Sequence, residues 1–100
     1  MNDINPMSLR KHLDNKDNVF LKLWKKGCGP CKMSVPAVDR LEKKFGESYE
    51  FVQICIDDHP EMTDITDSEV LPAFFVFSEG KKTNQSIGFK GLAKLQKLFS

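Results

Sequence analysis

The pattern of apolar and polar residues predicts four strands. Residues 19–24 are apolar at every position except Lys22, which is typical of a central strand covered on both faces. Residues 50–57 alternate well enough for a second strand. Residues 74–77 and 83–89 flank the turn sequence Ser-Glu-Gly-Lys, so they predict an antiparallel hairpin.

Helical spacing of apolar residues predicts helices over residues 6–13, 30–45, 60–66 and 91–99. Pro36 falls six residues into the second of these, where it removes a backbone donor and should kink the helix. A strand, a crossover helix and a further strand form a right-handed unit with parallel strands. From residue 19 onward the order βαβαββα therefore predicts an α/β fold with one mixed sheet.

Length and charge limit the possible functions. The chain has 100 residues, and we expect a single domain over residues 1–100. Fifteen basic and fourteen acidic residues leave a net charge of +1, which gives no reason to expect nucleic acid as a partner. No apolar run approaches the ~20 residues that span a bilayer, so we expect no membrane partner. Residues 1–6 do not resemble a secretory signal, and the three cysteines are too few for a disulfide framework. Together these features predict a reducing, cytoplasmic compartment.

The sequence Gly27-Cys28-Gly29-Pro30-Cys31-Lys32 lies between the first predicted strand and the second predicted helix. Cys28 is thus expected near a helix start, where free backbone N–H groups and the helix dipole stabilise a thiolate. Pro30 suits a first helical turn, because its missing N–H is not needed there. The spacing would let Cys28 attack a disulfide and Cys31 resolve the mixed disulfide that results.

Zinc binding is the alternative for a Cys-x-x-Cys pair. A zinc site would need further ligands, and Cys55, His12 and His59 are the remaining Cys and His residues. None of them forms a second closely spaced pair, and a strand-to-helix turn with Pro30 is not typical of a zinc knuckle. The pattern favours redox chemistry with no metal.

The sequence resembles the thioredoxin family over nearly its whole length. The matching features are Cys-Gly-Pro-Cys-Lys with Trp24 four residues before it, Ile56-Asp57, Leu71-Pro72, Glu79-Gly80 and Gly88. The resemblance implies a thioredoxin fold with a central mixed four-stranded sheet, plus a short first strand within residues 1–4 or none. It also implies a monomeric protein-disulfide reductase without a bound cofactor. Its partners would be disulfide-containing proteins and a thioredoxin-reductase-type electron donor.

The resemblance also implies roles for residues around the cysteines. Most X–Pro bonds are trans, but the family's matching proline is cis and packs against the disulfide, so Pro72 is expected to be cis. Val70 and Leu71 would pair with a bound substrate peptide as an added strand. Trp24 would border the active site, and Gly88 would let the substrate backbone approach.

Three further residues, Gly27, Lys22 and Cys55, bear on the function. Gly27 stands where the family usually has tryptophan, so the docking surface beside Cys28 is smaller. Lys22 stands where the family usually has a buried aspartate under the disulfide. Its long side chain can place the charged amine in solvent. Alternatively, the amine can be buried, either charged beside a thiolate or neutral as a proton acceptor. Cys55 is expected to be a small buried apolar residue.

Two further functions remain open at this point. One is a glutaredoxin-like enzyme that uses glutathione, although Gly29-Pro30 matches the thioredoxin dipeptide. The other is a binding subunit that uses the same surface to hold a partner, with incidental redox activity. Both would keep the fold and differ in what the two cysteines do.

Overall fold

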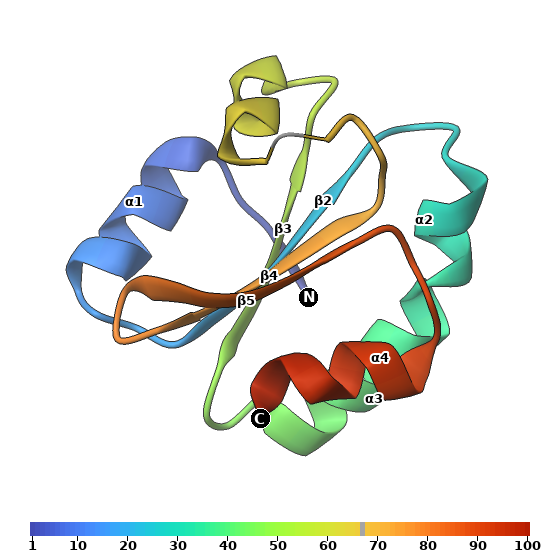
Figure 1. Ribbon diagram of the computed structural model, residues 1–100. Coiled ribbons are helices and arrows are strands. Elements are labelled where there is room, and N and C mark those ends of the chain that lie inside the picture. The colour runs from blue at the N-terminus through green and yellow to red at the C-terminus, as the bar shows by residue number, and fades with distance from the viewer. Residues whose placement is uncertain (67) are drawn as a thin grey trace.

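The computed structural model describes residues 1–66 and 68–100, and its centre is a five-stranded mixed sheet (Figure 1). The strands are β1 (Asn2–Asp3), β2 (Val19–Trp24), β3 (Glu50–Cys55), β4 (Ala73–Ser78) and β5 (Lys81–Ile87). Their order is β1-β3-β2-β4-β5. β3 runs parallel to β1 and β2, whereas β4 is antiparallel to β2 and β5. The four predicted strands are present, and the first strand that the sequence left open exists as a two-residue segment.

The helices differ in type and extent from the sequence prediction. They are α1 (Pro6–Asp14), α2 (Gly29–Met33), α3 (Val35–Phe45) and α4 (Leu92–Gln96), with 3₁₀ helices η1 (Pro60–Ile65) and η2 (Lys97–Phe99). The segment after β3 is thus a 3₁₀ helix, and the last helix changes to 3₁₀ geometry at its end. None of the described helices is long and apolar enough to cross a membrane.

The predicted kinked helix over residues 30–45 is two helices that meet at Ser34. Pro36 has no backbone N–H, so the carbonyl of Lys32 lacks the donor that a continuous helix would supply. The break frees groups in the last turn of α2 for other partners, which matters for the site described below.

Helices lie on both faces of the sheet (Figure 1), and the hydrophobic core has two halves, one on each face. Leu21 and Leu23 of β2 pack with residues of α1 and η1 on one face. Phe20 of the same strand packs on the other face with residues of α3 and α4. Because successive side chains of a strand point to opposite faces, β2 contributes to both halves and is buried at nearly every position.

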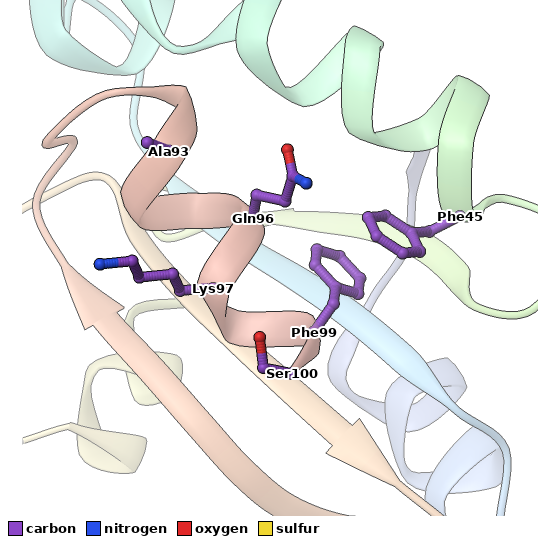
Figure 2. Close-up of a pocket in the computed structure, with 6 residues that line it drawn as sticks. All are labelled: Phe45, Ala93, Gln96, Lys97, Phe99 and Ser100. Carbon is purple, nitrogen blue, oxygen red and sulfur yellow. The ribbon is translucent and has the colours of Figure 1, made fainter.

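Aromatic rings fill the half of the core under α3 and α4. Phe20 lies 4.8 Å from Phe51 and 5.4 Å from Phe99, measured between ring centroids. Phe99 also stacks on Phe45 at 4.3 Å, beside a hollow of about 390 Å³ at the end of the chain (Figure 2). Residues of α3, α4 and η2 line this hollow, and neither cysteine of the pair is among them.

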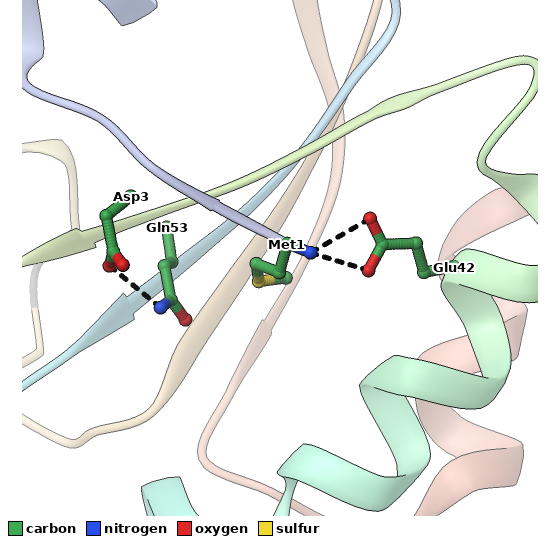
Figure 3. Close-up of polar contacts among 4 residues, drawn as sticks. All are labelled: Met1, Asp3, Glu42 and Gln53. Carbon is green, nitrogen blue, oxygen red and sulfur yellow. Dashed lines mark hydrogen bonds and ion pairs between the residues drawn. The ribbon is translucent and has the colours of Figure 1, made fainter.

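Two polar contacts tie the first residues to the rest of the molecule (Figure 3). The Met1 amine donates to both carboxylate oxygens of Glu42 on α3, at 2.7 and 3.0 Å. The Gln53 side-chain amide donates to the Asp3 carboxylate at 2.8 Å. These contacts join β1 to α3 and to β3.

The turn between β4 and β5 gives a stability prediction. Gly80 has a φ of +82°, and a Cβ there would collide with the carbonyl oxygen of Leu13. Gly91 also has a positive φ, but its surroundings are open. We expect Gly80→Ala to lower the free energy of unfolding by ~1–3 kcal/mol and by more than Gly91→Ala, because only the first adds a collision to the backbone strain. Urea unfolding of both variants measures this, and equal losses would contradict it.

Candidate active site

The two cysteines lie where β2 ends and α2 begins. Trp24 ends the strand. Gly27 in the following turn has a φ of +73°, a backbone conformation that residues with a side chain rarely adopt. Cys28 is the N-cap of α2, with extended backbone, and Gly29 and Pro30 form the first turn of the helix. This is the strand-to-helix arrangement that the sequence predicts.

Cys28 and Cys31 form a disulfide, with their Cα atoms 5.2 Å apart. The Sγ atom of Cys28 accepts a hydrogen bond from the backbone N–H of Cys31 at 3.2 Å. In the disulfide both residues are buried, with exposed fractions of 6% for Cys28 and 3% for Cys31. After reduction, the same N–H group can stabilise a thiolate on Cys28.

The segment that the resemblance assigns to substrate binding lies at the same end of the sheet. The Leu71–Pro72 peptide bond is cis, the isomer that the resemblance implies. Pro72 directly precedes Ala73, which pairs with Leu23 next to the end of β2. Figure 1 shows the chain before β4 and the turn after β2 at this end.

Gly88 brings the end of β5 to this segment. Its backbone N–H donates to the Pro72 carbonyl at 2.8 Å. A Cβ at Gly88 would lie 3.5 Å from a methyl carbon of Val70, whose side chain is 53% exposed. Val70, Leu71 and Gly88 therefore lie together on the surface beside the start of β4, with Pro72 buried beneath them.

Lys22 is buried, with an exposed fraction of 3%. The alternative in which its side chain carries the amine into solvent is therefore wrong. Its Nζ donates to the carbonyl oxygen of Cys31 at 3.0 Å. The buried hydroxyl of Ser34 donates to the same oxygen at 2.7 Å. Burial lowers the pKa of the Lys22 amine, and the charge of Asp39 opposes part of that shift.

A hollow of about 380 Å³ lies between the turn after β2 and the underside of α2. Its lining residues are Lys22, Trp24, Lys25, Lys26, Gly27, Cys31, Lys32, Val35 and Gln53. Trp24 is half-buried there, and its indole N–H has no hydrogen-bond partner among the described residues. The hollow gives the buried amine and Cys31 a route to solvent.

Sequence reasoning missed the roles of three polar side chains around the site. Ser34 has a recognisable signal, since serine often bonds to the carbonyl three residues earlier at the end of a helix. Asp39 becomes relevant once α3 docks near Lys22. Asp57 accepts a bond from the backbone N–H of Lys26 at 3.0 Å and thereby holds the turn before Cys28. Cys55 is buried, as expected.

A dithiol–disulfide pair at a helix start, on a mixed sheet with a neighbouring cis-proline, defines a class of proteins that exchange disulfides. Residues 1–66 and 68–100 contain no cluster of three or more His, Cys, Asp or Glu side chains that could hold a metal ion. What the site offers is the sulfur chemistry of its two cysteines.

Comparisons with known proteins agree with this class. The Thioredoxin family model matches residues 2–100. The thioredoxin of Mycoplasma genitalium is 32% identical over 85 residues, which cover 85% of this chain and 82% of that protein. The thioredoxin of Bacillus subtilis is 31% identical over 80 residues, covering 80% and 77%. Mitochondrial thioredoxin 3 of Saccharomyces cerevisiae, in its oxidised form, has the same fold, with a TM-score of 0.85, 22% identity and coverage of 97% and 91%.

The chain belongs to the thioredoxin family. It is a thiol–disulfide oxidoreductase, and Cys28 and Cys31 provide its disulfide-capable pair. The thioredoxin relatives favour this activity over the glutaredoxin-like alternative. Family membership also implies protein disulfides as substrates and a reductase as electron donor.

Proposed function

We propose that this protein reduces disulfides in other proteins, with Cys28 as the nucleophile and Cys31 as the resolving cysteine. The observation that supports this order is the hydrogen bond from the Cys31 N–H to the Cys28 Sγ at the N-cap of α2. That bond stabilises negative charge on Cys28, and the thiolate is the form of cysteine that attacks disulfides.

The cycle has two exchange steps. The Cys28 thiolate attacks one sulfur of a substrate disulfide, the substrate S–S bond breaks, and the other substrate sulfur leaves as a thiolate. Cys31 then loses its proton to solvent and attacks the Cys28 sulfur, which releases the second substrate sulfur as a thiolate. Two electrons have passed to the substrate, and a thioredoxin-reductase-type donor returns the Cys28–Cys31 disulfide to the dithiol.

The substrate chain is proposed to lie along Val70 and Leu71 as an added strand. The exposed side chain of Val70 and the close approach of Gly88 to it support a binding surface here. Trp24 and Pro72 would support the cysteine pair from two sides. The surface at Gly27 is open, because nothing lies within 4 Å of the position where a Cβ would be. We infer that substrates with bulky residues beside the disulfide are accepted on this side.

The chain is proposed to act as a monomer in a reducing, cytoplasmic compartment. The exposed large apolar side chains of the described residues belong to Met7, Met33, Val35 and Val70. Three of these lie near the cysteines in sequence or at the proposed substrate strand, where a transient partner would cover them. A reducing compartment would return Cys28 and Cys31 to the dithiol and keep Cys55 as a thiol.

Alkylation of the reduced protein tests the order of the cysteines. A brief exposure to iodoacetamide at neutral pH should label Cys28 well ahead of Cys31 and Cys55, because Cys28 has the N–H group that stabilises its thiolate. Mass spectrometry of the peptides measures the three rates. Faster labelling of Cys31 would reverse the proposed roles.

A second experiment separates reduction from simple binding. The double variant Cys28→Ser, Cys31→Ser keeps the surface of the fold and removes both reactive sulfurs. If the protein acts as a reductase, the double variant should lose all disulfide reduction and fail to replace the unchanged protein in cells. Full replacement in cells would mean that the protein acts mainly as a binding subunit.

A further inference from the structure

Lys22 is the one charged residue whose side chain is buried among residues 1–66 and 68–100. It lies in the middle of β2, opposite Gln53 of β3 and Phe74 of β4, and neither neighbour has a charge. A buried charge is costly unless other groups compensate for it. The contacts of the amine therefore indicate why a lysine is present at the centre of the sheet.

The amine of Lys22 lies directly under the resolving cysteine. Its Nζ donates to the Cys31 carbonyl at 3.0 Å, and Ser34 also donates to that oxygen. The carbonyl is available to both because α2 ends at Met33. Lys22 is thus held against the backbone of Cys31, the residue that carries the resolving sulfur.

The charged groups around this amine are mostly positive. Lys25, Lys26 and Lys32 share one hollow with it. Met1 and Asp39 share a second hollow of about 210 Å³ with it, and the Met1 amine is paired with Glu42. Asp39 is the acidic group whose charge acts on Lys22. The underside of the disulfide is therefore a region of positive charge, and the buried amine in it is hydrogen-bonded to Cys31.

We propose that Lys22 is a positioning residue whose positive charge favours the reduced, thiolate form of the Cys28–Cys31 pair and so makes the pair easier to reduce. The inference rests on the proposed redox function. It assigns a direction to the redox poise of this protein, which the fold alone does not determine.

The direction follows from the charges on each side of the reaction. When a dithiol donor reduces the pair, the Cys28–Cys31 S–S bond breaks, a disulfide forms in the donor, and the donor's two protons pass to the new thiols or to water. The disulfide is neutral, whereas the reduced pair contains a thiolate at neutral pH. A nearby ammonium stabilises the thiolate and leaves the disulfide almost unaffected. The same charge helps Cys31 to lose its proton before it attacks the mixed disulfide.

The test compares Lys22→Met, which removes the charge and keeps the length of the side chain, with Lys22→Arg, which keeps the charge. Lys43→Met is the matched control, because Lys43 is exposed on α3 and far from Cys31 in the chain. Two quantities are measured for each protein. The first is the equilibrium constant of the Cys28–Cys31 pair with glutathione, and the second is the pH at which Cys28 reaches half of its maximal alkylation rate.

For Lys22→Met we expect the equilibrium to shift about tenfold toward the disulfide, which corresponds to a potential about 30 mV more negative. The pH of half-maximal Cys28 alkylation should rise by about one, the equivalent of that tenfold change. Lys22→Arg and Lys43→Met should stay within about twofold of the unchanged protein. The difference between Lys22→Met and the unchanged protein should narrow at alkaline pH, where Lys22 itself loses its charge.

If Lys22 had a purely structural role, we would expect a different pattern. Lys22→Met would then have an altered unfolding midpoint but an unaltered potential and alkylation profile, and that result would overturn the inference. A shift toward the dithiol in Lys22→Met would overturn it as well. If Lys22→Met does not fold, Lys22→Gln is measured in its place against the same expectations. Failure of the unchanged pair to equilibrate with glutathione would refute the proposed function itself, which is a separate result.

Discussion

Replacing Cys31 with serine should leave this protein covalently bound to its substrates. Cys28 keeps its position at the N-cap of α2 and still attacks a disulfide, but no second sulfur is present to release the product. Serine is far less reactive toward disulfides than a thiolate. We expect steady-state disulfide reduction to fall by about a thousandfold or more, as it does when other enzymes lose a residue that acts in the covalent step.

The accumulated species identifies the step that has failed. Non-reducing electrophoresis and mass spectrometry of Cys31→Ser, mixed with a disulfide-bonded protein, should show a mixed disulfide through Cys28. Cys28→Ser should show none, and Cys55→Ser should reduce the substrate at the normal rate, because Cys55 is a buried free thiol that is not part of the disulfide. A mixed disulfide through Cys31 in the Cys28→Ser variant, formed equally fast, would refute the assigned order.

Removing the ring of Phe20 should be the most destabilising single change in the core. The side chain is fully buried and contacts three aromatic rings, Phe51 at 4.8 Å, Phe99 at 5.4 Å and Phe74 at 5.8 Å between centroids. We expect Phe20→Ala to lower the free energy of unfolding by ~3–5 kcal/mol, through lost burial and the cavity that remains. This loss is comparable with the lower end of the total stability of a small domain, about 5 kcal/mol.

Urea unfolding followed by circular dichroism measures the effect. Met7→Ala is the control, because Met7 is an apolar residue of α1 that is 70% exposed. It should change the free energy of unfolding by no more than about 0.5 kcal/mol. A loss below about 1 kcal/mol for Phe20→Ala would mean that the aromatic cluster contributes much less than its burial indicates.

The central part of the fold is predictable from sequence because its elements have strong local patterns. The apolar run at residues 19–24 predicts the observed bounds of β2. A strand that is buried on both faces leaves no doubt about which of its faces points into the core. The cysteine turn follows from its place between the apolar run and the next helical pattern, and Pro30 suits a first helical turn. The expectation of a cis bond at Pro72 came from the family resemblance, because local sequence alone favours trans.

The features that sequence reasoning missed depend on contacts between distant segments. The break at Ser34 and its bond to Cys31 are the exception, because Pro36 and a serine three residues after Cys31 are local signals. The burial of Lys22 does depend on distant segments. A lysine in an apolar strand is compatible with either a solvent-exposed or an internal amine. The choice is made by the Cys31 carbonyl nine residues away and by the position of Asp39.

In the proposed reaction, the Cys28–Cys31 dithiol passes two electrons to a protein disulfide. The most direct measurement mixes the fully reduced protein with a disulfide-bonded protein in a single turnover, quenches the mixture with acid, and identifies the disulfides of both proteins by mass spectrometry. We expect one new Cys28–Cys31 disulfide for every substrate disulfide that is lost, with Cys55 still a free thiol. Substrate reduction without formation of the Cys28–Cys31 disulfide, or no reduction at all, would contradict it.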